Sequence, residues 1–430
     1  MAHSILAAFC LWFLQERPYT DASFLKPPRY GGAVKGSSFM KAIINTKLIM
    51  EDGIIWDGAL TFDNGIIIQA GWKSDVHIPK DTEIINAEGK YTAPGLIDIH
   101  NHGGGDWLFA EDPLYCSQYF LRHGETTILP TFYHNLSMDQ MIEGARRVRE
   151  SAKIGAGRVM YGLYMEGPFM NLSGSFQNEM KWSGSVKEED YIKLVKELGD
   201  MVRIWAIDPD RENIESFLRY VKKETPNVIF AHGHSSSTAE AIHSIAHYGV
   251  KVRTHITDSG QPKGRAQGTP GAGGDEYALC EPNMYAELIC DENAIHVVPW
   301  LIKAIVKTKG VEKICLISDS MPSRGNFKNN ESEGIWYGSD LNYDDEGHLA
   351  GSRMTLDNGV RNMMTHTGYG LCHAIRMATL NPARLLGIDY KVGSLETGKI
   401  ANLILIDDAV HVDKVFLYGE LAVNNNEVLV

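Results

Sequence analysis

Histidine and carboxylate residues recur at the ends of short apolar runs in this chain, in a pattern that could hold a metal ion. In chain order they are His100 and His102 after GLIDI, Glu166 in LYMEGP, His232 and His234 in FAHGHS, His255 in VRTHIT, and Asp319 in CLISDSM. Imidazole nitrogens and carboxylate oxygens are ligands that zinc and related divalent ions bind in proteins. Because residues i and i+2 of a strand point to the same side, His100 and His102 can face one metal. Successive runs with such endings predict one metal site built from several segments.

Each of these residues also has an ordinary structural interpretation. The His-x-His pair could be two unrelated core or surface histidines. A buried Glu166 could form a salt bridge, since an unpartnered buried carboxylate is costly. His243 and His247 have the i, i+4 spacing of a helical zinc pair, but AEAIHSIAHYGV lacks the HExxH glutamate and reads as a helix face. The metal interpretation therefore depends on the repetition of the pattern and not on one motif.

The apolar runs belong to a repeating unit between about residues 94 and 389. Eight can be counted, and each is followed by a longer helical pattern: GLIDIHNH, ETTILPT, RVMYGLYMEGP, VRIWAIDP, VIFAHGHS, KVRTHIT, AELICDE and KICLISDSM. Eight buried strands that alternate with helices predict an α/β fold, the (β/α)8 TIM barrel. Functional side chains of such barrels lie at the C-terminal ends of the strands, which is where the candidate ligands fall.

Both ends of the chain have a different pattern, in which short β-prone runs are separated by turns. Residues 40–93 contain AIINTKLIM and GIIIQAG, and residues 390–430 contain KIANLIL and KVFL. Since these patterns are typical of strands, we expect a small β-sandwich domain formed by both chain ends, beside a metal-dependent hydrolase barrel at 94–389. Residues 1–39, with the Pro/Gly-rich stretch KPPRYGGAVKGSS, are expected to be a poorly ordered leader or extension before the folded protein. Their apolar run has about the size of a signal h-region but lacks the basic n-region of a signal peptide.

The composition of the 430-residue chain narrows the class of protein. Hydrophobic residues make up 44% and charged residues 22%, as in ordinary globular proteins. The formal net charge of −13 argues against nucleic-acid partners, because a phosphate backbone needs a basic surface. The six cysteines form no CxxC pair, so neither a disulfide framework nor a thiolate zinc site is expected. The cysteines read as buried thiols in a reducing compartment, so we expect a cytoplasmic protein. No membrane partner is expected, since the apolar run near the N-terminus is too short to span a bilayer.

The motifs PGLIDIHNHG, MEGP, GHS, TH and DSM, in this order, resemble the amidohydrolase superfamily and most closely its N-acetylglucosamine-6-phosphate deacetylases. The resemblance extends from about residue 40 to 430 and includes the tail VGSLETGKIANLILID. It implies the metal ligands Glu166, His234 and His255, with His100 and His102 available for a second metal. It therefore implies one or two divalent ions per chain, with zinc preferred and iron, cobalt or manganese as alternatives.

The resemblance also implies roles for other residues. Asp319 would be the catalytic acid and base, and His296 in NAIHVVP would contact the substrate. Amide hydrolysis needs an activated water and a polarised carbonyl, both of which a divalent metal supplies. One carboxylate can take the water proton and deliver it to the departing amine. We therefore expect a deacetylase that hydrolyses the N-acetyl amide of an amino-sugar phosphate, such as N-acetylglucosamine 6-phosphate, and releases acetate.

Three departures from the family pattern concern the phosphate. The family's Asn-Ala pair after the Thr-His motif reads Asp258-Ser259 here, and an acidic side chain repels a phosphate. Residues 173–177 replace the family's Lys-Lys-Gly-x-His stretch, and Arg265 matches the phosphate-binding arginine only after a one-residue shift. In the resembled family that arginine comes from a neighbouring subunit, so we expect a homodimer. The alternatives are a deacylase of an unphosphorylated N-acyl amino sugar or N-acyl-D-amino acid, and a non-catalytic metal-binding barrel.

Overall fold

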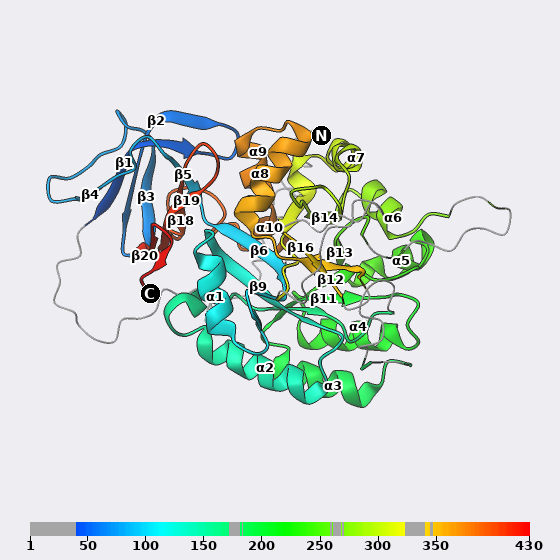
Figure 1. Ribbon diagram of the computed structural model, residues 1–430. Helices are drawn as coiled ribbons and strands as arrows, with labels where there is room; N and C mark the ends of the chain where they lie inside the picture. The colour runs from blue at the N-terminus through cyan, green and yellow to red at the C-terminus, as the bar shows by residue number, and fades with distance from the viewer. Residues whose placement is uncertain are drawn as a thin grey trace, which may run out of the picture.

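The main body of the protein is an eight-stranded barrel with a smaller β layer packed beside it (Figure 1). The computed structural model describes residues 40–171, 181–182, 184–258, 260, 268, 271–322, 340–344 and 347–430. The expected leader, residues 1–39, lies outside the described residues.

The barrel strands are the eight apolar runs of the sequence. They are β6 (Leu96–Asn101), β9 (Glu125–Tyr133), β10 (Leu163–Glu166), β11 (Val202–Ile207), β12 (Ile229–His232), β13 (Val250–Arg253), β14 (Tyr285–Ile289) and β15 (Ile314–Ile317). Neighbours in this sequence order pair in parallel, from β6 through to β15. Parallel strands are buried on both faces, which explains why the runs are almost continuously apolar.

The first and last strands meet just beyond their C-terminal ends and close the barrel. The N–H of Asp319 donates to the carbonyl of His100 at 3.0 Å, and the N–H of His102 donates to the carbonyl of Ser320 at 3.0 Å. The carboxylate of Asp98 in β6 accepts from the hydroxyl of Ser318 at 2.5 Å. These contacts place the His-x-His segment directly beside Asp319, and the expected (β/α)8 fold is confirmed.

A helix follows each strand and covers the outside of the barrel. The helices are α1 (Pro113–Leu121), α2 (Met138–Ser151), α3 (Glu188–Leu198), α4 (Ile214–Glu224), α5 (Ala239–Ile245), α6 (Gly274–Cys280), α7 (Pro299–Lys309) and α8 (Leu356–Thr367), with α9 (Leu371–Met377) and α10 (Leu380–Leu385) after the last strand. The start of α2 shows how the sequence sets these boundaries. Ser137 and Gln140 form a reciprocal capping box, which satisfies two N–H groups at the helix N-terminus.

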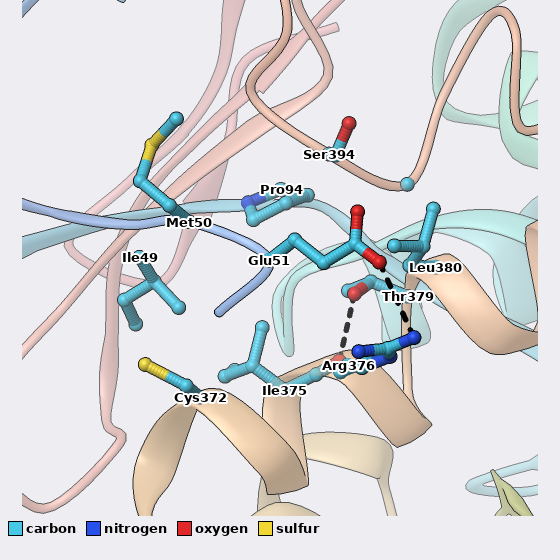
Figure 2. A pocket seen from close by; sticks show the side chains of 11 residues that line it. Ile49, Met50, Glu51, Pro94, Cys372, Ile375, Arg376, Thr379, Leu380 and Ser394 are labelled. Carbon is cyan, nitrogen blue, oxygen red and sulfur yellow. Dashed lines mark hydrogen bonds and ion pairs between the residues drawn. The ribbon is translucent and has the colours of Figure 1, made fainter. Parts of the chain in front are cut away.

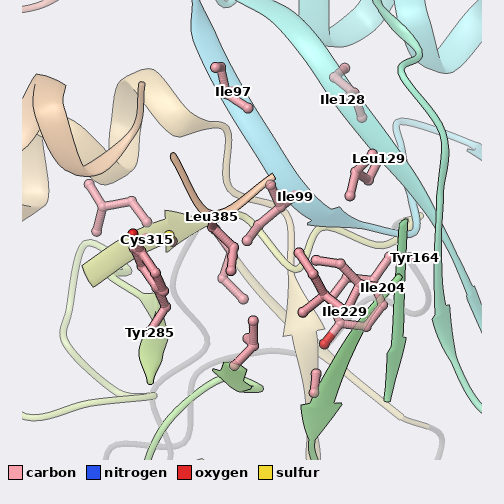
Figure 3. Packing of buried hydrophobic residues seen from close by; sticks show 14 of the residues in the cluster. Ile97, Ile99, Ile128, Leu129, Tyr164, Ile204, Ile229, Tyr285, Cys315 and Leu385 are labelled. Carbon is pink, nitrogen blue, oxygen red and sulfur yellow. The ribbon is translucent and has the colours of Figure 1, made fainter. Parts of the chain in front are cut away.

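Apolar side chains from neighbouring strands fill the body of the barrel, as Figure 3 shows for Ile97, Ile99, Leu129 and Ile204. These four side chains are fully buried or nearly so. The barrel is therefore a packed core and not a pore.

Strands from both ends of the chain form the smaller β layer. They are β1 (Lys41–Ile49), β2 (Ile54–Asp63), β3 (Ile66–Trp72), β4 (Glu83–Asn86), β5 (Tyr91–Pro94), β18 (Leu403–Ile406), β19 (Val412–Leu417), β20 (Glu420–Asn424) and β21 (Glu427–Val428). Their sheet order is β21-β20-β19-β18-β5-β1-β2-β3, with β4 beside β1. Phe62 in β2 and Phe416 in β19 are four places apart in this order, yet their rings are 5.7 Å apart. The sheet therefore folds over an apolar core, as expected for a small β-sandwich made by both ends.

The turn between β1 and β2 joins this layer to the barrel. The carboxylate of Glu51 lies 3.2 Å from Arg376 in α9 and 2.8 Å from Arg384 in α10. Figure 2 shows Glu51 and Arg376 at a small hollow, which is also lined by Cys372 and Ser394. Its described lining includes none of the predicted site residues, so we interpret it as part of the packing between the two units.

Four very short strands make two hairpins near the barrel mouth. They are β7 (Gly103–Gly104) with β8 (Trp107–Leu108), and β16 (Leu341–Tyr343) with β17 (Leu349–Ser352). The second hairpin fixes the segment after β15, because the N–H of Ser352 donates to the carbonyl of Asp319 at 2.8 Å.

Candidate metal centre

The candidate ligands lie at or just beyond the C-terminal ends of five barrel strands. His100 is the second-to-last residue of β6, and Glu166 is the last residue of β10. Three others follow β12, β13 and β15 by two residues, and all have left-handed backbones: φ is 46° at His234, 22° at His255 and 47° at Asp319. Positive φ is uncommon for residues with a side chain, and such conformations are found in turns and at functional sites. Here it occurs at three of the residues that the sequence assigns to the site.

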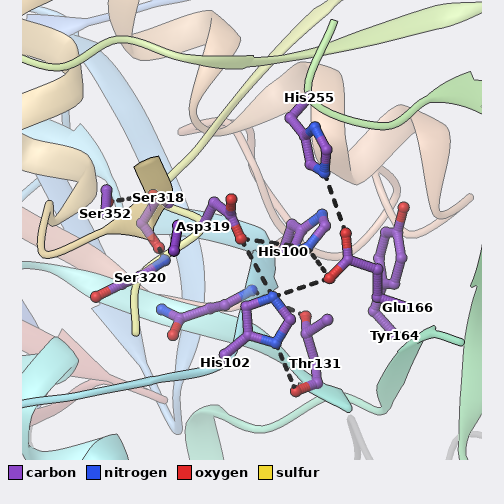
Figure 4. A network of polar contacts seen from close by, with 12 residues as sticks. His100, His102, Thr131, Tyr164, Glu166, His255, Ser318, Asp319, Ser320 and Ser352 are labelled. Carbon is purple, nitrogen blue, oxygen red and sulfur yellow. Dashed lines mark hydrogen bonds and ion pairs between the residues drawn. The ribbon is translucent and has the colours of Figure 1, made fainter. Parts of the chain in front are cut away.

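Glu166 lies between two pairs of histidines, and Figure 4 shows three of these four side chains, His100, His102 and His255. Its Oε1 atom lies 2.9 Å from Nε2 of His234 and 3.1 Å from Nε2 of His255. Its Oε2 atom lies 3.1 Å from Nε2 of His102 and 3.5 Å from Nε2 of His100. Each carboxylate oxygen therefore faces one pair, and the residue can contribute a ligand atom to two adjacent metal positions.

Asp319 lies on the side of the His100 and His102 pair. Its Oδ1 atom is 3.2 Å from Nε2 of His102 and 3.5 Å from Nε2 of His100. The structure thus brings together all six residues predicted to bind metal or move protons.

The charges of the cluster are strongly coupled. Burial raises the pKa of Glu166, but the charges of His100 and His234 outweigh it and hold this pKa well below its usual range. Burial alone would raise the pKa of Asp319, but the hydrogen bond with His102 and the charges of the neighbouring histidines lower this pKa overall. Both carboxyl groups are therefore ionised at neutral pH, which is the state that a metal ligand or proton acceptor requires.

The donor set fits a divalent metal. Two groups of three ligand atoms each lie within 4.8 Å of one another: His100, His102 and Glu166, and Glu166, His234 and His255. The Nε2 atom of His100 is buried and has no hydrogen-bond partner among the described residues, although it faces the carboxylates of Glu166 and Asp319. A buried polar atom without a hydrogen bond is costly. A cation bound at this nitrogen would remove that cost, and nitrogen and oxygen donors suit zinc and its neighbours.

The structure describes two of the four predicted substrate-binding residues, His296 and Asp258. His296 is buried, and its Nδ1 atom lies 3.1 Å from Oδ2 of Asp291. Burial lowers its pKa, but the hydrogen bond with Asp291 and the charges of Asp258 and Asp319 produce a net rise. Asp258 is partly exposed, and its Oδ2 atom lies 3.8 Å from Nδ1 of His255. It therefore lies beside a candidate ligand as well as near His296.

Two predicted substrate residues, Ser259 and Arg265, lie outside the described residues, as does the stretch 173–177. Two site residues were missed by the sequence analysis. Asp291 supports His296, and Glu287 in β14 lies 3.0 Å from Nδ1 of His100. A signal for Glu287 was present, because a carboxylate within the apolar run AELIC must find a buried partner.

An eight-stranded barrel with histidines and carboxylates gathered at the strand ends defines a barrel hydrolase with a candidate metal centre. The sequence model of the Amidohydrolase family matches residues 91–422, and the chain belongs to this family. The expected enzyme class, an amidohydrolase, is thereby confirmed.

Relatives and solved structures agree with this membership. The chain is 26% identical to the N-acetylgalactosamine-6-phosphate deacetylase of Escherichia coli O157:H7, over 87% of this chain and 97% of the relative. It is 27% identical to the N-acetylglucosamine-6-phosphate deacetylase of Haemophilus influenzae, over 84% of this chain and 94% of the relative. The crystal structure of the N-acetylglucosamine-6-phosphate deacetylase from Pasteurella multocida superposes with a TM-score of 0.77, at 24% identity, and covers 90% of this chain and 100% of that one. The last comparison supports the fold.

A search of the described helices finds none with both the length and the apolar character needed to cross a bilayer.

Proposed function

We propose that this protein is a metal-dependent deacetylase that hydrolyses the N-acetyl amide of an amino-sugar 6-phosphate and releases acetate. N-acetylglucosamine 6-phosphate or a close epimer is the proposed substrate. The observation that carries the proposal is the position of Glu166 between two histidine pairs with Asp319 alongside. Relatives whose names specify this reaction, similar over more than four-fifths of the chain, support the choice of substrate.

We propose Glu166, His234 and His255 as the ligands of one metal, and His100 and His102 as ligands of a second. Zinc is the proposed ion because the donors are imidazole and carboxylate groups, although iron, cobalt and manganese accept similar donors. When bound, a divalent ion supplies the acidified water and the Lewis acid that amide hydrolysis needs.

The protein's own groups supply proton transfer and orientation. The ionised carboxylate of Asp319 accepts the proton of the attacking water and then donates it to the nitrogen of the departing amine. His296 is held by Asp291, which accepts from its Nδ1–H and leaves Nε2 for a substrate oxygen.

One observation favours a second candidate. The partly exposed carboxylate of Asp258 lies near His255 and His296, where it repels a dianionic phosphate and can accept hydrogen bonds from sugar hydroxyl groups. The second proposed activity is therefore deacylation of an unphosphorylated N-acyl amino sugar or an N-acyl-D-amino acid.

Acetate release tests both proposals. Purified enzyme is assayed with N-acetylglucosamine 6-phosphate, N-acetylgalactosamine 6-phosphate, the two plain sugars and a panel of N-acetyl-D-amino acids. A higher kcat/KM for the phosphorylated sugars supports the first proposal, and a preference for a plain substrate supports the second. Metal analysis accompanies the assay. A metal-loaded protein that releases acetate from none of these compounds would favour the non-catalytic barrel.

We also propose the domain limits 40–93 with 390–430 for the β-sandwich and 94–389 for the barrel, with 1–39 as an extension. A homodimer is proposed as the assembly. Light scattering coupled to size-exclusion chromatography measures its mass, and a mass near 47.8 kDa would contradict the dimer.

A further inference from the structure

A carboxylate outside the proposed ligand set lies directly behind one of the metal-facing imidazoles. Glu287 is the middle residue of β14 and is fully buried. Its Oε2 atom lies 3.0 Å from Nδ1 of His100 and also accepts from the backbone N–H of His255 at 3.3 Å. One oxygen atom therefore contacts a residue from each of the two proposed metal positions.

The contact with His100 fixes which ring nitrogen carries the proton. A neutral imidazole has one N–H and one free lone pair, so a proton held on Nδ1 leaves Nε2 available to a metal. The carboxylate of Glu287 can only accept, and it therefore selects the form of His100 with its proton on Nδ1. The other ring nitrogen, Nε2, faces Glu166 and Asp319.

The neighbouring ligand is supported differently. Nδ1 of His102 lies 3.2 Å from the backbone carbonyl of Thr131, which is neutral. Glu287 instead brings a full negative charge behind His100, which makes the imidazole a stronger electron donor. Because Glu287 is a side chain, this support can be removed by substitution.

The backbone around Glu287 holds the carboxylate in place. The carbonyl of Glu287 accepts from the N–H of Ile256 at 2.9 Å, and Glu287 pairs with Cys315 of β15. Glu287 thus holds the segment that carries His255 with both its own carbonyl and its own carboxylate.

We propose that Glu287 is a positioning residue for the metal held by His100 and His102, and that it also aligns this position with the one at His255. The inference depends on the two-metal centre proposed above, and it concerns metal affinity rather than the choice of substrate. Partners of this kind, when removed, typically lower metal affinity about 10- to 100-fold.

The test is a titration of metal-free protein with Zn²⁺ by calorimetry, with metal content measured after dialysis. The wild type is compared with Glu287→Leu, which removes the acceptor, and Glu287→Gln, which keeps an acceptor oxygen but loses the charge. His102→Ala serves as the reference for a chain that has lost the His100 and His102 position.

The matched control is Glu125→Gln. Glu125 is another fully buried carboxylate of the barrel, at the first residue of β9 and so at the opposite end from the proposed ligands, and its Oε1 atom accepts from the N–H of Leu356 at 3.0 Å. Its substitution should leave both metal affinities as in the wild type, even where it lowers the melting temperature.

The metal held by His100 and His102 is identified as the one that His102→Ala loses. The affinity for this metal should fall about 10- to 100-fold in Glu287→Leu, and toward the lower end of that range in Glu287→Gln. The remaining metal should change less. Wild-type affinity in both variants, or an equal loss of both metals, would overturn the proposal. If Glu287→Leu does not fold, as judged by circular dichroism, Glu287→Gln decides by the same criterion.

The result is separable from the proposed activity. A wild-type chain that binds no more metal than His102→Ala overturns the second position and this inference with it, while acetate release can persist. Two bound metals with the expected loss in Glu287→Leu support the inference even if no amino sugar is a substrate.

Discussion

The Oδ1 atom of Asp319 lies 3.2 Å from the Nε2 atom of His102. Glu166 approaches the same nitrogen with its Oε2 atom at 3.1 Å. The proposed proton acceptor therefore stands on the His100 and His102 side of the cluster, while the pair formed by His234 and His255 contacts the other oxygen of Glu166. This division predicts different consequences for substitutions on the two sides.

Asp319→Asn should retain the metal at Glu166, His234 and His255 but lose turnover. The amide has nearly the shape of the carboxylate but cannot accept the proton of the attacking water. We expect kcat to fall about 10²- to 10⁴-fold, the usual contribution of a general acid and base. Steady-state acetate release and metal analysis of the same preparation measure both effects. Wild-type turnover would show that another group moves the proton.

Substitutions of His255 and His102 should separate the two metal positions. His255→Ala removes one of the three ligands at the position formed by Glu166, His234 and His255, and should abolish bound metal there together with activity. His102→Ala should remove at most one metal and leave the other in place. The measurement is metal per chain after dialysis, with His243→Ala as a control in a helix outside the cluster. Full metal content and full activity in His255→Ala would refute the ligand assignment.

A third prediction concerns stability at alkaline pH. Lys309 at the end of α7 is buried, and its Nζ atom donates to the carbonyls of Ala278 at 2.8 Å and Glu281 at 2.7 Å. Burial, followed by the charge of Lys313, lowers its pKa to about 8. The folded protein therefore loses this proton at lower pH than the unfolded chain, whose lysines have a pKa of about 10.4.

Between these two pKa values the unfolded state holds more protons, so the contribution of Lys309 to the free energy of unfolding rises with pH. The maximum slope is about 1.4 kcal/mol per pH unit. Urea unfolding at pH 7 to 10 should show this rise in the wild type relative to Lys309→Met. Parallel pH profiles for the two proteins would contradict the lowered pKa.

The sequence predicted the barrel and most of the site for one physical reason. Parallel barrel strands are buried on both faces, so each run stays apolar until it reaches the functional end. A histidine or carboxylate at that point, such as Glu166 or His255, is conspicuous in the sequence. The eight runs and the six clustered residues were recognised in this way.

Partners that depend on three-dimensional register could not be identified from the sequence. Glu287 lies inside a strand that is buried on both faces, so no alternation of polar and apolar residues shows where its side chain points. Its role depends on the pairing of β14 with β15 and on the position of His100 across the barrel. The left-handed backbones of His234 and Asp319 were equally hidden, because glycine and asparagine are the residues that usually signal positive φ.

The fourth prediction concerns Arg265, which lies outside the described residues. If the substrate is phosphorylated, this arginine should supply a bidentate contact to the phosphate. A charged hydrogen bond contributes about 1.5–3 kcal/mol, so Arg265→Ala should raise KM for the phosphorylated amide about 10- to 150-fold. The same variant should be nearly unchanged with the plain sugar, and equal effects on both substrates would argue against a phosphate contact.

The last prediction uses Asp258 to decide between the two proposed substrates. Its carboxylate is partly exposed and lies near His255 and His296, so it adds negative charge where a phosphorylated substrate would need positive charge. Asp258→Asn keeps the shape of the side chain and removes this charge. A partly exposed charge pair contributes up to about 1 kcal/mol, so KM for a phosphorylated sugar should fall by up to about fivefold. For the plain sugar the same change should leave KM nearly constant if phosphate is the natural group. If KM for the plain sugar rises instead and the phosphorylated compound stays a poor substrate, Asp258 binds a sugar hydroxyl group and the unphosphorylated substrate is the correct assignment.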